Sequence, residues 1–266
     1  MYHALWPALD ERDALLRHWA GDTQLQDPGA RLYGLDQRVF RRQMLALNKA
    51  GAQTRCPWAE LAAPGPHRLL ITFDDGHQSN FELALPVLEE LGLMAIFFIT
   101  SDWIGRKDFL DEEQILGLRR AGMLIGSHGV THRYFSDLSA DEVRRELADS
   151  KARLEGILGE SVPGLSLPGG RAHPALRPIA REVGYRHLFT STPALANSAG
   201  DPLAWPRIWP RIPITNLLSD DFVERLARGE TAAVRRMARV ARLRRLARGL
   251  LGNSLYDRLR GRILGG

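Results

Sequence analysis

The sequence contains very little cysteine. Cys56 is the single cysteine among 266 residues, which excludes an internal disulfide and a cysteine-based zinc site, and which is compatible with a reducing compartment. Long apolar runs are also missing, because no stretch approaches the roughly 18 uncharged residues that a membrane-spanning helix needs. The first residues show no basic segment followed by an apolar one, so the sequence predicts no signal peptide.

Acidic residues are scarce at the end of the chain. Residues 231–266 hold ten arginines and one acid, Asp257, for a net charge of +9. Since the whole chain carries +5, residues 1–230 sum to −4, and the basic character belongs to the tail. We therefore divide the chain into a folded domain at 1–230 and an arginine-rich, amphipathic helical tail at 231–266.

Apolar runs alternate with helical patterns from residue 68 onward. The patterns predict strands at 68–73, 94–99, 123–126, 165–167, 186–190 and 207–214. They predict helices at 80–91, 112–121, 139–158 and 174–184, preceded by two more at 7–20 and 37–50. Pro86 lies inside one of these helices and predicts a kink or a late start. Repeated strand–helix units of this spacing favour a parallel α/β sheet, open or closed into a barrel of six or seven strands.

Two pairs of potential ligands directly follow predicted strands. Asp74 and Asp75 follow strand 68–73, and His128 and His132 follow strand 123–126. Each pair has an ordinary alternative, since Asp-Gly is a common turn and a histidine pair in a loop can be incidental. However, the carboxyl ends of parallel strands converge on one mouth. One carboxylate and two imidazoles, on one face if the segment is helical, form a metal-binding set, and the second carboxylate is then placed as a general base.

These two stretches resemble the first two motifs of the polysaccharide deacetylase family of carbohydrate esterases. T-F-D-D-G at 72–76 and S-H-x-x-x-H at 127–132 match them in order and spacing, and the opening Met-Tyr-His is similar to the family's first barrel strand. The resemblance covers roughly residues 1–215. It implies an α/β fold, a distorted (β/α) barrel of about seven strands in a single domain, followed here by the C-terminal basic helical tail. It also implies hydrolysis of an acetyl group on a glycan.

The resemblance assigns roles to individual residues. It implies that Asp75, His128 and His132 ligate a divalent metal, with Zn²⁺ preferred, although cobalt and nickel accept the same ligands. It implies that Asp74 is the catalytic base, which takes a proton from a water molecule that the metal acidifies. The oxyanion that forms then needs a backbone N–H donor, and that of Gly169 is the candidate.

The third family motif, an Arg-x-Pro-aromatic-Gly pattern, is altered in this chain. Pro168 and Gly170 match it, but Ser166 stands where the arginine that holds the base is usual, and Gly169 stands where an aromatic residue is usual. Arg171 is a candidate to supply the missing guanidinium. We predict that four residues contact the substrate: Trp103, Pro168, Gly170 and Arg171. The alternatives are that 168–170 form a plain turn and that Trp103 belongs to the core.

The family's last motif, Leu-x-His, is missing because no histidine follows His187. That motif usually supplies the general acid. The remaining candidates for the acid, each of which is also explained by a structural role, are His3, His77, His173 and His187.

Three functions remain open at this stage. The first is a metal-dependent deacetylase that removes acetyl groups, N-acetyl in preference to an acetyl ester, from a polysaccharide or its lipid-linked precursor in exopolysaccharide or cell-envelope biosynthesis. The second is a glycan-binding relative that has lost turnover, which the altered third motif and the missing histidine suggest. The third is a metal-dependent hydrolase of a small amide.

The tail also allows several interpretations. Its arginines alternate with apolar residues, which suits a helix lying on an anionic membrane surface. The same pattern suits a helix that packs its apolar stripe on the domain and turns its arginines to solvent. No recognition-helix pattern favours nucleic acid. We expect a cytoplasmic protein, in contact with the inner face of the cell membrane if the first interpretation holds.

Overall fold

A computed structural model gives the three-dimensional structure of the chain. It describes residues 1–2, 5–6, 34–52, 54, 58, 61, 69–194, 205–215, 218–228 and 230–251. The predicted helix at 7–20 and the end of the tail, 252–266, lie outside these residues.

The centre of the fold is a curled parallel sheet of six short strands in chain order. They are β3 (Ile71–Phe73), β4 (Ala95–Ile99), β5 (Leu124–Ser127), β6 (Gly164–Ser166), β7 (His187–Phe189) and β8 (Arg207–Trp209). All five residues of β4 are buried, as expected for a strand covered on both faces. Two further strands, β1 (Leu5–Trp6) and β2 (Leu35–Asp36), pair with each other in parallel. The predicted α/β barrel fold is therefore confirmed.

The first two residues join the two edges of the sheet. Tyr2 pairs with Phe73 of β3, where its N–H donates to the Thr72 carbonyl oxygen at 2.7 Å. On the other side, Ile214 N–H donates to the Met1 carbonyl oxygen at 2.9 Å. The segment after β8 thus reaches β3 through Met1 and Tyr2, which take the place of a first barrel strand. Among the described residues the curled sheet itself has six strands, and Met1 and Tyr2 bridge its two edges.

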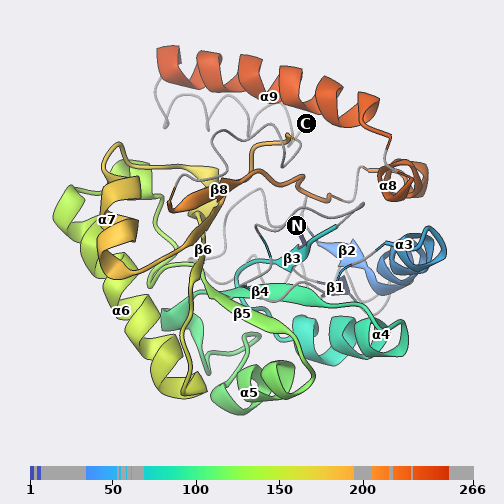
Figure 1. Ribbon diagram of the computed structural model, residues 1–266, viewed down its shortest axis with the longest axis horizontal. Coiled ribbons are helices and arrows are strands. Elements are labelled where there is room, and N and C mark those ends of the chain that lie inside the picture. Colours follow the sequence, from blue (N-terminus) through green and yellow to red (C-terminus); the bar gives the residue numbers. More distant parts are fainter. Residues whose placement is uncertain are drawn as a thin grey trace.

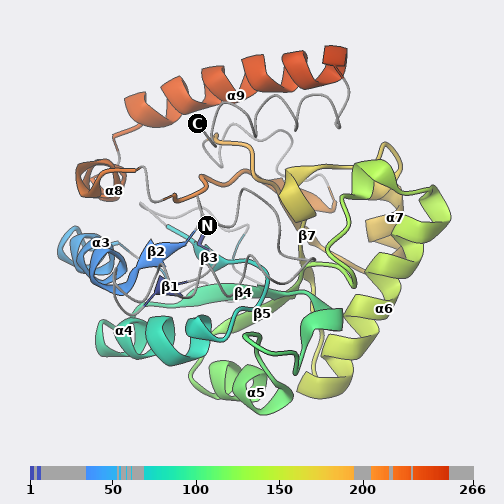
Figure 2. The same ribbon diagram turned by 180° about the vertical axis from the view of Figure 1, so that it is seen from behind.

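Helices lie around the outside of the strands (Figures 1 and 2). They are α3 (Gln37–Lys49), α4 (Leu85–Glu90), α5 (Glu112–Arg120), α6 (Ala140–Leu158), α7 (Leu176–Val183), α8 (Asp220–Ala227) and α9 (Ala232–Leu251). Side-chain oxygens of Asp36, Asp111 and Ser139 cap α3, α5 and α6, which confirms these predicted helix starts. A π-helical turn, Asn80–Ala84, precedes α4, so the α-helix begins late, next to Pro86, as the proline predicted.

The last strand is shorter than predicted. Residues 207–214 were expected to form one strand, but β8 ends at Trp209. Pro210 and Pro213 flank the following segment and have no N–H to donate to a strand ladder. Arg211 therefore lies beyond the carboxyl end of a strand, on the same side of the sheet as Asp74.

Within residues 230–251 the tail is helical from Ala232, and its first turns pack on the domain. Val234 of α9 is buried and Met237 contacts the main hydrophobic core. Further along, Val240 and Leu243 are 42% and 67% exposed, and four arginines on the same helix are exposed: Arg235, Arg236, Arg239 and Arg242. Among the described residues, no helix is long and apolar enough to cross a membrane.

Gly126 of β5 lies directly against the ring of Phe98 on the neighbouring strand β4. An added Cβ there would lie 2.4 Å from the Phe98 ring, so Gly126→Ala should lower the free energy of unfolding by about 1–3 kcal/mol. The control is Gly156→Ala on the exposed side of α6, where a Cβ meets nothing within 4 Å and should stabilise by about 0.5–1 kcal/mol. Urea unfolding measures both, and equal stability of the two variants would contradict the packing.

Candidate metal centre and active site

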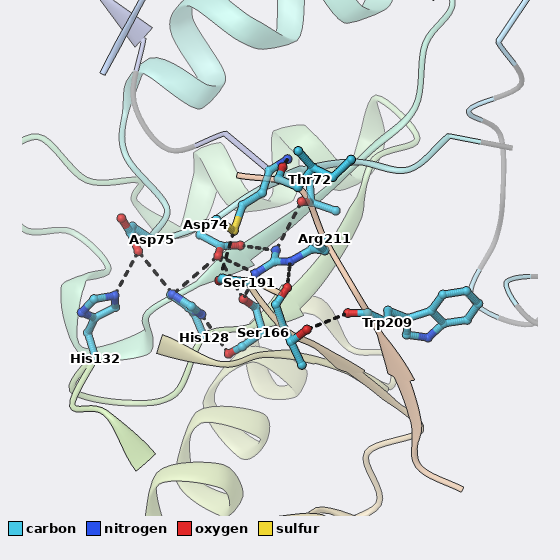
Figure 3. A network of polar contacts seen from close by, with 12 residues as sticks. Thr72, Asp74, Asp75, His128, His132, Ser166, Ser191, Trp209 and Arg211 are labelled. Atoms are coloured by element: carbon cyan, nitrogen blue, oxygen red, sulfur yellow. Dashed lines mark hydrogen bonds and ion pairs between the residues drawn. The ribbon is translucent and has the colours of Figure 1, made fainter. Parts of the chain in front are cut away.

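The acid pair directly follows β3, and its two side chains point to different partners (Figure 3). Asp74 is 2% exposed, and its backbone N–H donates to the Tyr2 carbonyl oxygen at 2.9 Å. Asp75 has a left-handed backbone with φ 76°, a conformation that aspartate tolerates better than most residues. This turn directs the Asp75 carboxylate toward the histidines while Asp74 stays inside the barrel mouth.

The histidine pair lies after β5 in a loop and not on a helix. His128 is 1% exposed, and its Nδ1 is 2.9 Å from the Ser166 carbonyl oxygen. Since a carbonyl oxygen only accepts, Nδ1 carries the proton and the lone pair is on Nε2, which faces Asp75. Gly129 (φ 80°) and His132 (φ 64°) turn the loop back, which brings the two imidazole centroids to 5.1 Å. The segment is not helical, so the two histidines do not share a helix face, but the loop still brings their rings together.

Asp75, His128 and His132 form a compact donor set. The Asp75 Oδ1 atom lies 3.4 Å from His128 Nε2 and 3.3 Å from His132 Nε2. All three donor atoms lie within 4.8 Å of one another. Ligands about 2.0–2.1 Å from a tetrahedral zinc ion are about 3.3 Å apart, so these distances fit a divalent metal. A cation also offsets the repulsion between the Nε2 lone pair of His128 and the carboxylate.

A buried arginine holds the Asp74 carboxylate. Arg211 Nη1 and Nη2 donate to the two carboxylate oxygens at 2.7 and 2.8 Å, a bidentate pair. The other donations of the same guanidinium go to Thr72 Oγ1 at 3.2 Å, Ser166 Oγ at 2.6 Å and the Thr190 carbonyl oxygen at 3.0 Å. All five N–H groups of the guanidinium thus have an acceptor.

This arrangement corrects the interpretation of the third motif. The absence of an arginine at position 166 suggested that Asp74 lacks a guanidinium partner, or that Arg171 supplies it. Instead Arg211 does so, and the Arg171 guanidinium lies over the Tyr134 ring, 4.0 Å from its centroid. Ser166 Oγ donates to Asp74 Oδ2 at 3.0 Å, so the small residue takes part in the same network. The signal missed in the sequence is that Pro210 ends β8, which places Arg211 at the mouth.

The predicted substrate-contacting residues are distributed around this centre. Trp103 lies beside the metal set, with its ring 5.0 Å from that of His132. Pro168 to Gly170 form a 3-10 turn directly after β6, with Gly169 at φ 58° and exposed. An added Cβ at Gly169 would lie 2.6 Å from Tyr134 Cε1, so Tyr134 occupies the space next to this glycine. The roles of these residues toward a substrate stay predictions.

The other described histidines have structural partners. His77 Nδ1 contacts Ser79 Oγ at 2.7 Å, and burial lowers the pKa of His77 to about 4. Burial likewise lowers the pKa of His187 to about 4, and Trp209 Nε1 donates to its Nδ1. His173 Nδ1 accepts from the Ala175 N–H before α7. A general acid is therefore not evident from these three, and His3 lies outside the described residues.

The Asp-His-His set lies at the carboxyl ends of the strands of a parallel (β/α) barrel, beside a second buried aspartate. This arrangement is suited to metal-dependent hydrolysis. Residues 62–188, just under half of the chain, match the model of the family described as polysaccharide deacetylase. Members of the family are generally metal-dependent.

Two curated relatives match about half of this chain. YxkH of Bacillus subtilis, named as a polysaccharide deacetylase, is 30% identical over 167 residues, 60% of this chain and 60% of that protein. A peptidoglycan-N-acetylglucosamine deacetylase of Bacillus cereus is 29% identical over 124 residues, 46% of this chain and 56% of that protein. The matched part therefore spans less than two thirds of either relative.

A solved structure shares the fold. The deacetylase PplD of Streptococcus pyogenes, in complex with acetate, superposes with a TM-score of 0.69 at 22% identity. The likeness covers 83% of this chain and 93% of that one.

The two arginines of the mouth can be distinguished by mutation. Arg211→Ala leaves the buried Asp74 carboxylate without its counter-charge and should lower the free energy of unfolding by about 3–5 kcal/mol. Arg171→Ala, also at a buried arginine, should cost the same in the wild type as in the Asp74→Asn variant, because the Arg171 guanidinium lies over the Tyr134 ring while Arg211 binds both Asp74 oxygens. Urea unfolding of each variant in an Asp74→Asn background completes the test. Coupling of Asp74 to Arg171, and not to Arg211, would overturn the assignment.

Proposed function

We propose that the protein is a zinc-dependent hydrolase that removes acetyl groups from a polysaccharide or its lipid-linked precursor, in exopolysaccharide or cell-envelope glycan biosynthesis. The proposal prefers an N-acetyl over an O-acetyl group. The observation that carries it is the Asp75–His128–His132 donor set beside an Asp74 carboxylate that Arg211 orients. The peptidoglycan-N-acetylglucosamine deacetylase among the relatives supports an N-acetylated sugar as substrate.

The residues of the chain divide the work as follows. When bound, a divalent metal supplies Lewis-acid chemistry toward water and toward an acetyl carbonyl oxygen. Asp74, whose Oδ2 is 3.9 Å from His128 Nε2, lies next to the donor set and accepts the proton of the attacking water. The Gly169 N–H, on the exposed turn after β6, donates to the developing oxyanion. Trp103 offers an aromatic face for a sugar ring beside His132.

The non-catalytic alternative has lost one of its two supports. It was suggested by the missing arginine of the third motif and by the missing last histidine. Arg211 supplies the guanidinium from the segment that follows β8, with both Asp74 oxygens engaged. The missing general acid alone does not require loss of turnover, since the sugar oxygen of an acetyl ester is a better leaving group than the nitrogen of an amide.

Acetate release tests the function and the cofactor together. The purified protein should release acetate from N-acetylated and O-acetylated glycans, lose this activity with a chelator, and regain it with zinc. Small acetamides should be poor substrates, which separates a polymer deacetylase from a small-amide hydrolase. Zinc binding without acetate release from any glycan of the panel would favour the glycan-binding alternative.

The roles of the two aspartates should separate in the same assay. Asp74→Asn should lower kcat at least 100-fold while zinc still binds, because the donor set is intact. Asp75→Asn should weaken zinc binding itself, because it removes the carboxylate ligand. Activity of Asp74→Asn close to that of the wild type would refute its assignment as the base.

We further propose that α9 contacts an anionic membrane surface, with the protein in the cytoplasm at the inner face of the cell membrane. The support is the exposure of Val240 and Leu243 on a helix that also exposes four arginines, since the cytoplasmic leaflet is anionic.

Liposome sedimentation tests this second proposal. The protein should bind vesicles that contain anionic lipid and not neutral vesicles. Leu243→Glu with Arg239→Glu should reduce binding at least tenfold without changing acetate release, whereas Arg177→Glu at an exposed position of α7 should not reduce binding. Equal binding by all variants, or none by the wild type, would rule out membrane contact through α9.

A further inference from the structure

A buried glutamate of α6 faces the loop that carries the two histidine ligands. Glu146 is 7% exposed and lies in the middle of the helix. Its Oε2 accepts the N–H groups of Val130 at 2.7 Å and Thr131 at 3.0 Å. Its Oε1 accepts the Thr131 hydroxyl at 2.5 Å. One carboxylate therefore binds three donors from the segment between His128 and His132.

These contacts leave the loop little freedom. Two consecutive backbone N–H groups that converge on one oxygen form a concave anion site and set the direction of the chain at both residues. An added Cβ at Gly129 would lie 3.0 Å from Glu146 Oε2, so the loop backbone rests directly against the carboxylate. Charge-assisted hydrogen bonds to a buried carboxylate are the strong kind.

The two histidines depend on this support to different degrees. His128 is held independently, because its backbone N–H donates to the Ile99 carbonyl oxygen at 2.8 Å and its Nδ1 to the Ser166 carbonyl oxygen at 2.9 Å. His132 directly follows the two residues that Glu146 binds and has a left-handed backbone, φ 64°, which is uncommon for residues other than glycine. The backbone of His132 thus needs an external constraint, and Glu146 is positioned to provide it.

We propose that Glu146 is a positioning residue for the metal centre: it holds the loop 128–132 so that His132 Nε2 meets Asp75 Oδ1 and His128 Nε2. The inference rests on the proposed function only in that the Asp-His-His set binds zinc. It concerns how tightly zinc is bound, and not which glycan is hydrolysed. Removing a residue that supports a metal ligand by hydrogen bonds typically weakens metal binding 10–100-fold.

The same helix offers a matched control. Glu155 of α6 also accepts a loop N–H, that of Val162 at 2.9 Å, and it pairs with Lys151. This loop precedes β6, at the opposite end of that strand from Ser166. Glu155→Ala therefore removes a comparable anchor without touching the histidine loop.

Zinc competition titrations with a chromophoric chelator test the proposal on the full chain. Glu146→Ala should weaken zinc binding 10–100-fold, Glu146→Gln should weaken it less because its amide oxygen still accepts from the loop, and Glu155→Ala should leave it within twofold. Adding Glu146→Ala to His132→Ala should weaken binding no further, because the residue acts through His132. Urea unfolding of the zinc-free variants shows whether Glu146→Ala is folded. If it is not, Glu146→Gln and Thr131→Val decide the outcome.

The possible failures are distinguishable. If the wild type binds no zinc, the proposed function and this inference both fail. If the wild type binds zinc and Glu146→Ala binds it equally tightly, or if Glu155→Ala weakens it as much, Glu146 is not a positioning residue and the proposed function is unaffected. Acetate release at saturating zinc should recover in Glu146→Ala to within about tenfold of the wild type, and a persistent larger loss would contradict a role through metal binding alone.

Discussion

The buried ion pair between Asp74 and Arg211 is the interaction on which the closure of the barrel and the arrangement of the site both depend. Asp74 follows the first strand of the sheet and Arg211 follows the last, so the pair joins its two edges. Both side chains are almost fully buried, and removing two such charges from water costs several kcal/mol per ion. The bidentate geometry and the full set of acceptors around the guanidinium offset this cost. The same contacts fix the orientation of the Asp74 carboxylate.

Ser166 connects this ion pair to the metal set. Its hydroxyl donates to Asp74 and accepts from Arg211, while its carbonyl oxygen binds His128 Nδ1. A larger residue at this position would occupy the space that the Arg211 guanidinium fills. Ser166, which stands where an arginine is usual, is therefore part of a different network, in which the guanidinium comes from the segment after β8. On the other side of the site, Glu146 of α6 supports the histidine loop.

Much of the fold followed from local patterns, and the deviations have local causes. Helices α3, α5 and α6 begin directly after their caps, Asp36, Asp111 and Ser139, close to the predicted starts, because a cap depends on neighbouring residues alone. The last strand was predicted too long, because the apolar pattern continues past two prolines that interrupt the ladder. The histidine loop is not helical, because residues with positive φ reverse the chain there and a spacing of four residues does not distinguish a loop from a helix. The metal set was recognisable because its residues lie directly at strand ends.

The sequence by itself determined the alternating strands and helices, the resemblance to the polysaccharide deacetylase family, and the positions of Asp74, Asp75, His128 and His132 after their strands. These features depend on residues close together in the chain, where spacing and composition carry the information. Only the tertiary structure decided that Arg211 pairs with Asp74, that Ser166 joins the two halves of the site, and that Glu146 supports the histidine loop. Arg211 and Asp74 are 137 residues apart, and no local pattern records such a pairing. The curl of the sheet brings the two together, and with them both edges of the barrel.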